Sequence, residues 1–368
     1  MSDTLSNRAL NRATLARQLL LERATLPPLR VIQQLVGLQA QEPRDPYVAL
    51  WTRLDGFCPE QLEALLLDRS VVRIVVMRGT IHLVSADDAL ALPTLVQPVL
   101  DAELTRHPQF APFLRDVELS PVLAFVRSLL ADAPRTPAEL RAAIAQEFPD
   151  LHPGAMAYAC RNHLALVQVP PRGLWHRSAQ VRYSTAEAWL GRPLEREPSI
   201  DDVVLRYFAA FGPATAADVT AWSRLTGMRE VVERLAPRLR TFSDERGRVL
   251  YDLPDAPRPH PDTPAPTRFL PEYDNVLLSH ADRSRFTHPD ERRRTWDAPD
   301  IRGTVLHDGI VSATWSLDGK AAPRTLLVHH PAALPKRARA AIEAEGRRFL
   351  RFVDASNAAG DVRLVETG

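Results

Sequence analysis

Cysteine, lysine and long apolar runs are scarce or missing in this chain. The two cysteines, Cys58 and Cys160, show neither CxxC nor histidine-paired spacing, so we expect no disulfide framework and no metal site. Lysine occurs only at Lys320 and Lys336, so arginine carries nearly all of the positive charge. No apolar run approaches the length of a membrane span, and residues 1–4 lack the basic and apolar character of a signal peptide. We therefore expect a cytoplasmic protein that binds no membrane.

The charge balance is close to even. The chain of 368 residues has a formal net charge of +1 and a pI near 7.9, with 45% hydrophobic and 25% charged residues. These values are ordinary for a globular protein, and the length predicts two or more domains. A strong nucleic-acid binder is usually basic, so binding to phosphate would require the arginines to gather on one face.

Two glutamines, Gln39 and Gln41, flank a single alanine at the end of an apolar-striped segment. The apolar residues ahead of them recur at helical spacing and are Leu29, Ile32, Leu35 and Val36. A helix that continued through this segment would aim the Gln39 amide at the same interior face. A buried amide needs partners for its donors and its acceptor, from the protein or from a bound molecule. The pair is therefore a candidate site.

One pattern, Pro-x-Thr-x-Ala-acid-aliphatic, occurs twice, at residues 134–140 and 213–219. In each copy the threonine can cap a helix and the acid can close a capping box. The helices expected around the two copies are 122–130 with 155–164, and 203–211 with 228–235; the strand pairs that follow are 166–169 with 180–183, and 239–242 with 249–253. Three helices and a β-hairpin in that order are typical of a winged helix, which docks a helix and a wing on DNA.

The N-terminal segment fits the same plan less closely. Its expected helices are 10–22, 29–38, 48–54 and 59–67, and its expected wing is 71–77 with 80–84, turned over Arg78 and Gly79. We therefore predict an α+β fold in which three tandem winged-helix modules are followed by a small β-rich C-terminal domain. The three modules are residues 1–118, 119–196 and 197–253.

A proline-dense segment, residues 254–266, follows the third module and should stay extended as a linker between domains. In residues 267–368 the pattern becomes strand-like. Asp308-Gly309 is a strong signal for a two-residue hairpin turn. The elements expected in this domain are strands 304–307, 310–315, 325–329 and 362–365 and a helix over 336–352.

Five blocks of this sequence resemble, in their order, the bacterial winged-helix DNA glycosylases typified by AlkZ and YcaQ. The blocks are residues 38–41, 50–54, 77–84, 271–280 and 303–315. The resemblance implies a glycosylase that removes bulky N7-alkylated purines from double-stranded DNA without a cofactor, with interstrand crosslinks among the candidate substrates. In that family a glutamine–apolar–glutamine motif, or a variant ending in aspartate, carries catalysis, which implies that Gln39 and Gln41 are catalytic. No sustained heptad pattern predicts a dimer interface, so we expect a monomer.

An amide pair suits this chemistry. Guanine alkylated at N7 carries a positive charge and is already an activated leaving group, so the enzyme must stabilise an oxocarbenium-like sugar and place a water molecule. A glutamine cannot act as a base at neutral pH. We therefore expect Gln41 to position the water, and Gln39 to orient that water or the sugar.

Two arginines flank the glutamines. Arg44 and Arg53 either hold DNA phosphates or pair with Asp45 or Asp55.

Four further residues are expected to bind DNA or to line its cleft. Arg78, Thr80 and His82 lie on the predicted first wing, with Arg78 on a phosphate or in a groove and the other two in the catalytic cleft. A histidine packed on a strand face is an equally good interpretation of His82. His307, at the tip of the C-terminal hairpin, either probes a groove or belongs to an ordinary turn.

Two other functions fit parts of the pattern. A non-enzymatic DNA-binding regulator could use the same modules, but it would need no glutamine pair and would usually need a dimer. An interaction scaffold without DNA binding is favoured by the near-neutral charge. A flat salt dependence of binding to plain duplex would identify the scaffold, because phosphate contacts are always salt-dependent.

Overall fold

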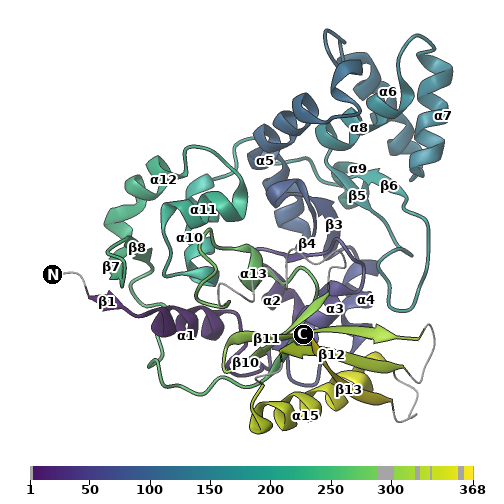
Figure 1. Cartoon of the computed structure of the whole chain (residues 1–368). Coiled ribbons are helices and arrows are strands. Elements are labelled where there is room, and N and C mark those ends of the chain that lie inside the picture. Colours follow the sequence, from purple (N-terminus) through teal and green to yellow (C-terminus); the bar gives the residue numbers. More distant parts are fainter. Residues whose placement is uncertain (1–2, 288–301, 320–323, 332–333, 355–359, 368) are drawn as a thin grey trace.

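Helices and strands alternate along the chain in an α+β architecture. The computed structural model describes residues 3–287, 302–319, 324–331, 334–354 and 360–367. Within these ranges the strands form three sheets. Figure 1 shows one sheet near the centre, helical groups on either side of it, and a second large sheet with its helix below. None of the described helices combines the length and the apolar character that a membrane crossing requires.

The first group of elements builds the central sheet. Its elements are α2 (Pro28–Gln34), β2 (Leu38–Gln39), α3 (Asp45–Arg53), α4 (Pro59–Leu67), β3 (Val71–Val75), the 3-10 turn η1 (Met77–Gly79) and β4 (Ile81–Ser85). β3 and β4 pair antiparallel, as expected for the first wing, and α4 has the bounds that the sequence predicts.

The N-terminal helix belongs with a distant part of the chain. The elements concerned are β1 (Thr4–Leu5), α1 (Asn7–Arg17), α10 (Ile200–Phe211) and β7 (Arg240–Asp244). β1 pairs in parallel with β7, and α1 packs on α10. Arg17 forms a fully buried ion pair with Asp252, with 2.6 Å between Nη1 and Oδ1. The start of the chain therefore completes the third group of elements rather than the first.

A long helix that the sequence analysis did not predict, α5 (Ala86–Arg106), joins the first group to the second. Pro93 and Pro98 lie inside it, and proline usually ends or kinks a helix because it removes a backbone donor. Ser85 caps its start by accepting a hydrogen bond from the Asp88 amide. The helix packs on β3 and β4, so tertiary burial outweighs the local cost of the two prolines.

The second and third groups have the predicted order of helices and strands. The second contains α6 (Ser120–Asp132), α7 (Pro137–Glu147), α8 (Pro153–His163), β5 (Leu166–Gln168), β6 (Tyr183–Thr185) and α9 (Ala186–Leu190); the third contains α10, α11 (Ala216–Ser223), α12 (Met228–Leu235), η3 (Ala236–Arg238), β7 and β8 (Val249–Asp252). Both predicted capping boxes are confirmed, Thr136 with Glu139 and Thr215 with Asp218.

The first and second groups share one sheet. Its strand order is β2-β4-β3-β5-β6, because β5 pairs antiparallel with β3 as well as with β6. The strand pair of the second group is therefore not a free-standing hairpin. Its two strands are separated by the long loop of residues 169–182, which reaches toward the C-terminal domain.

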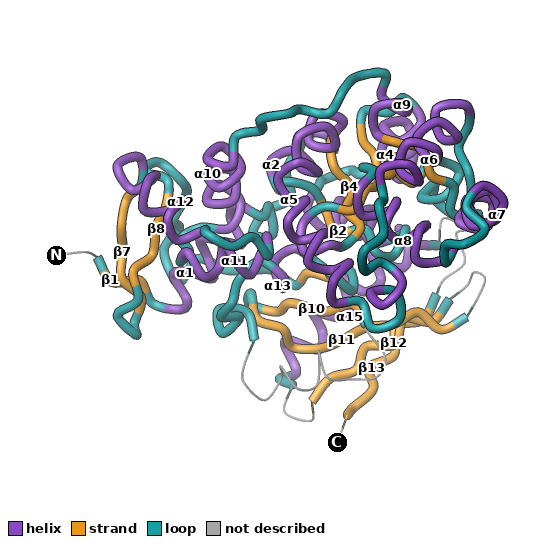
Figure 2. The backbone as a smooth tube through the Cα atoms, turned by 90° about the horizontal axis from the view of Figure 1, so that it is seen from above, coloured by secondary structure: helices purple, strands orange, loops and turns teal. Residues whose placement is uncertain are grey.

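The C-terminal domain is a five-stranded sheet covered by a helix. Its elements are β9 (Arg268–Leu270), α13 (Asn275–Leu278), β10 (Gly303–His307), β11 (Ile310–Asp318), β12 (Thr325–Pro331), α15 (Lys336–Val353) and β13 (Asp361–Thr367). The predicted turn at Asp308-Gly309 is confirmed, with φ of 49° and 80° at these two residues. Figure 2 shows β10 to β13 side by side at one edge of the molecule.

The proline-dense linker contains two turns, at residues 253–256 and 260–263, where a fully extended segment was expected, and it does not hold the domains apart. Arginines of α1 donate to its backbone carbonyls: Arg8 Nε to Pro261 at 2.9 Å and Arg12 Nε to Thr263 at 2.6 Å. The linker therefore lies along α1 and ties the third group to the C-terminal domain.

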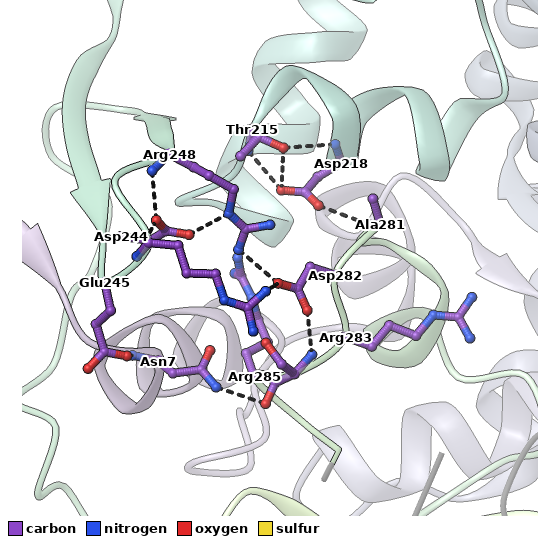
Figure 3. A network of polar contacts seen from close by, with 12 residues as sticks. Asn7, Thr215, Asp218, Asp244, Glu245, Arg248, Ala281, Asp282, Arg283 and Arg285 are labelled. Atoms are coloured by element: carbon purple, nitrogen blue, oxygen red, sulfur yellow. Dashed lines mark hydrogen bonds and ion pairs between the residues drawn. The ribbon is translucent and has the colours of Figure 1, made fainter. Parts of the chain in front are cut away.

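A polar network adds a second tie between these two parts (Figure 3). Asp282, just after α13, accepts hydrogen bonds from Arg246 at 3.0 Å and from Arg248 at 2.8 Å, both in the loop between β7 and β8. The Ala281 amide donates to Asp218, near the start of α11, at 2.9 Å. The chain after α13 is thus held against the third group by charge-assisted hydrogen bonds.

A buried ion pair joins α3 to the start of α13. Arg53 Nη1 and Nη2 donate to the two carboxylate oxygens of Asp274 at 2.8 and 2.7 Å, and neither side chain is exposed to solvent. The expectation that Arg53 contacts DNA or pairs with Asp45 or Asp55 was therefore wrong. Its position late in α3 turns it into the core.

Removing one partner of this pair should destabilise the protein strongly. We expect Asp274→Ala to lower the free energy of unfolding by about 3–5 kcal/mol, because Arg53 would keep an uncompensated buried charge. Chemical denaturation measures this loss. Asp87→Ala is the matched control, since Asp87 pairs with Arg192 at an exposed position (73% and 57% exposed side chains) and should change stability little. Equal effects of the two substitutions would contradict the structural role of the buried pair.

Candidate active site

The glutamine segment lies on an edge strand, which corrects the expectation of a helix end. After α2, Val36 and Gly37 turn the chain with φ of 55° and 88°, and β2 then pairs antiparallel with β4 so that Gln39 lies opposite His82. A Cβ at Gly37 would come within 2.7 Å of Val84 Cγ1, so this turn requires glycine. Gln39 is 5% exposed, so its inward orientation is as expected, but a strand produces it.

The middle residue of the glutamine–apolar–glutamine pattern belongs to the core. Ala40 continues the pairing: its N–H donates to the Ile81 carbonyl at 2.8 Å, and its carbonyl accepts from Arg73 at 2.7 Å. Successive side chains of an extended backbone point to opposite faces. Ala40 is fully buried in the core and Gln39 is buried, while Gln41, in the bend that follows β2, is exposed.

Arg78 holds the Gln39 amide. Its Nη2 donates to Gln39 Oε1 at 2.5 Å and to His82 Nε2 at 3.2 Å, and its Nη1 donates to the Trp222 carbonyl of α11 at 2.8 Å. The η1 turn presents the side chain in this way because Arg78 and Gly79 both have positive φ, 59° and 70°. The guanidinium thus faces protein acceptors, which corrects the expectation that it binds a phosphate.

His82 lies behind this contact and is neutral. Its Nδ1 donates to the Thr80 carbonyl at 3.0 Å, so the Nε2 that faces Arg78 is the acceptor. Burial, together with the Arg78 charge, lowers the pKa of His82 to about 3. Burial also lowers the pKa of Arg78 to about 10, which leaves the guanidinium charged at neutral pH. His82 is 3% exposed and therefore supports Gln39 through Arg78 instead of lining an open cleft.

A residue far along the chain closes the open edge of β2. Asn275 Oδ1 accepts from the Gln39 N–H at 3.2 Å, and its Nδ2 donates to the Gly37 carbonyl at 2.7 Å. An edge strand leaves backbone groups unpaired, and Asn275 satisfies them here. No sequence pattern assigned Asn275 a role. The signal that could have found it was the block of residues 271–280, which had a family resemblance but no assigned role.

The C-terminal hairpin tip does not reach toward the site. His307 Nδ1 meets the Thr267 hydroxyl at 2.9 Å, and the Gly309 carbonyl accepts from Asn11 of α1 at 2.8 Å. Asp308 pairs with Arg8, also of α1, at 2.9 Å. Of the two interpretations of His307, the structure supports the ordinary turn.

A cleft of about 490 Å³ lies between α5, α8 and the turn that links α11 to α12. Charged and aromatic side chains of its wall are Glu103, Arg106, His107, Tyr158 and Arg224. The Glu103 carboxylate occupies the space beside the Cα of Gly79, so the cleft borders the turn that carries Arg78. Arg106 and Arg224 are exposed, and Arg161 lies 5.8 Å from the centre of the Tyr158 ring. We name this cavity the arginine cleft.

A second cleft, of about 600 Å³, begins directly after the glutamine segment. Arg44 and Arg177 are exposed on its wall, and Arg172 is half-buried there; the last two belong to the long β5–β6 loop. Burial raises the pKa of Asp45 well above its usual range, and the nearby carboxylates of Glu272 and Glu42 raise it further. Within the described ranges, no three His, Cys, Asp or Glu side chains gather as metal ligands would.

The comparisons with known proteins identify the family. The profile of the family described as "DNA glycosylase AlkZ-like" matches residues 32–352. The solved structure of Streptomyces sahachiroi DNA glycosylase AlkZ superposes with a TM-score of 0.80 at 20% sequence identity, covering 98% of this chain and all of that chain. No curated protein matches in sequence. The chain belongs to the AlkZ-like DNA glycosylase family, and it is therefore an enzyme that acts on DNA rather than a regulator or a scaffold.

The neutral His82 should make the protein sensitive to acid. Its folded pKa of about 3 lies below the unfolded value of about 6.5, so the unfolded state binds more protons between these values and stability falls as the pH falls through them. Between pH 7 and pH 5 we expect wild type to lose about 2 kcal/mol more of unfolding free energy than His82→Gln. Chemical denaturation at the two pH values measures the difference. An imidazole resonance of His82 that titrates near pH 6.5 would contradict the assignment.

Proposed function

We propose that this glycosylase hydrolyses the N-glycosidic bond of bulky N7-alkylated purines in double-stranded DNA, by attack of a water molecule that two glutamines position. The observation that carries the proposal is the firmly held Gln39 carboxamide beside the exposed Gln41. Among the described residues, the side chains hydrogen-bonded to Gln39 are Arg78 and Asn275, and neither can act as a general base. A site built from amides suits a substrate that needs little activation.

The reaction needs no strong base because the leaving group is already cationic. The water oxygen forms the bond to C1′, the electron pair of the C1′–N9 bond passes to the purine and neutralises its charge, and a water proton passes to solvent. Preorganised dipoles stabilise the positive charge that develops on the sugar. We assign the water to Gln41, which is exposed, and a contact with the damaged nucleotide to Gln39.

The surface beside the glutamines supports a path for duplex DNA. Arg106 and Arg224 of the arginine cleft are exposed next to the η1 turn, and Arg44 is exposed just after Gln41. The order of three helices and an antiparallel strand pair supports the assignment of the second and third groups as winged-helix modules. We propose that these modules hold the duplex and that the protein acts as a monomer. A net charge of +1 does not oppose this, since DNA binding depends on where the exposed arginines lie, and Arg44, Arg106 and Arg224 are exposed.

Crosslinked purines are included among the proposed substrates. A base tethered to the opposite strand cannot swing into the closed pocket that base-flipping enzymes use. Here Gln41 is exposed, and it lines neither the arginine cleft nor the second cleft. Such an arrangement can reach a lesion that stays in its groove.

Loss of either glutamine amide should slow excision. We expect Gln39→Ala or Gln41→Ala to reduce the single-turnover release of N7-alkylguanine by about tenfold or more, which corresponds to a barrier increase on the order of 1.4 kcal/mol. Affinity for the DNA should change little. Gln146→Ala, an exposed glutamine of α7, is the matched control and should match wild type. Wild-type rates in both site variants would refute the catalytic assignment.

The enzyme should be monofunctional and leave an abasic site. Strand cleavage by a lyase step requires an amine that forms a Schiff base with the sugar. Of the two lysines, Lys336 begins α15 in the C-terminal domain, and Lys320 lies outside the described residues. We expect borohydride to trap no covalent adduct between the protein and DNA during excision. An adduct abolished by replacing Lys320 or Lys336 would require a different mechanism.

A further inference from the structure

The orientation of the Gln39 amide is fixed by chemistry. A guanidinium has only N–H donors, so the Gln39 atom that Arg78 Nη2 meets at 2.5 Å must be the carbonyl oxygen. The opposite orientation would place two donors face to face. The backbone N–H and C=O of Gln39 belong to β2, and the N–H donates to Asn275. In the side chain, Arg78 holds the oxygen, so the Nε2 group is the part left for another molecule.

The other partners of Arg78 are also acceptors, so they fix the position of its guanidinium. His82 Nδ1 faces the Thr80 carbonyl and must carry the proton, which makes Nε2 an acceptor for Arg78 at 3.2 Å. The Trp222 carbonyl accepts from the other terminal nitrogen, Nη1, at 2.8 Å. The guanidinium is therefore held on three sides by acceptors, one of which is the Gln39 oxygen.

We infer that Gln39 acts in the reaction as a hydrogen-bond donor through Nε2, and that Arg78, itself held by His82 and Trp222, is the positioning residue that fixes this orientation. The ligand of Gln39 is then an acceptor atom, an oxygen or nitrogen of the damaged nucleotide. The Gln39 oxygen already accepts from Arg78, so Nε2 is the group that remains to meet the nucleotide. This inference rests on the proposed catalytic role of Gln39 and adds the direction of its hydrogen bond.

Gln39→Glu separates a donor from an acceptor at this position. The carboxylate keeps an oxygen toward Arg78 and forms an ion pair with it, so the thermal midpoint should equal or exceed that of wild type. The second oxygen replaces the Nε2 donor with an acceptor. We expect single-turnover excision of N7-methylguanine to fall by about tenfold or more, as in Gln39→Ala. A Gln39→Glu enzyme with the wild-type rate would overturn the inference.

A double-mutant cycle tests whether Arg78 acts through Gln39. We expect Arg78→Met to slow excision by about tenfold in the wild-type background and to add less than about twofold to Gln39→Ala, because the group that it orients is then missing. Effects that multiply would show that Arg78 acts independently, on DNA or on folding, and would overturn its role. DNA affinity and thermal midpoints, measured for all four proteins, identify any loss of fold.

The outcomes also distinguish this inference from the proposed function. If Gln39→Ala excises at the wild-type rate, the catalytic role of Gln39 fails, and the donor role fails with it. If Gln39→Ala is impaired while Gln39→Glu is fully active, the catalytic role stands and the donor role alone is refuted.

Discussion

Arg53 and Asp274 are both shielded from solvent, and their bidentate ion pair sets the relation between the two ends of the molecule. Arg53 closes α3, the helix that follows the glutamine segment, and Asp274 also caps α13 by accepting from the Val276 amide. A buried charge tolerates little displacement of its partner, since the low-dielectric interior penalises separation. The pair therefore locates α13, and with it Asn275, against the edge of β2. Asn275 then holds the outer edge of β2, while β4 holds the inner edge.

The candidate active site draws on parts of the chain that are distant in sequence. Gln39 comes from an edge strand, Arg78 from the turn of the neighbouring hairpin, the Trp222 carbonyl from α11 and Asn275 from the C-terminal domain. Each contributes a hydrogen bond and none contributes a general base. In the proposed mechanism the site holds dipoles in place before the substrate arrives, which is effective only when the surrounding fold is rigid.

Arginine has two kinds of position in this nearly neutral chain. Some arginines pair with acids in the interior, as Arg17 does with Asp252 and Arg324 with Asp354. A guanidinium suits buried pairs because it stays charged and binds a carboxylate through two nitrogens. Exposed arginines such as Arg106 and Arg224 lie on the wall of one cleft. Net charge alone could not reveal this division.

Local sequence patterns by themselves determined several helix starts, helix bounds and one turn of this protein. The capping boxes of α7 and α11, the bounds of α4 and α12, and the Asp308-Gly309 turn follow from interactions within a few residues, so they could be read from the sequence. The family resemblance singled out the glutamine pair. Only the tertiary structure decided that Gln39 lies on a strand, that α5 forms despite two prolines, and that Arg53 and His307 are structural. Each of these depends on partners that lie far away along the chain, and no local pattern encodes which distant group will satisfy a buried polar atom.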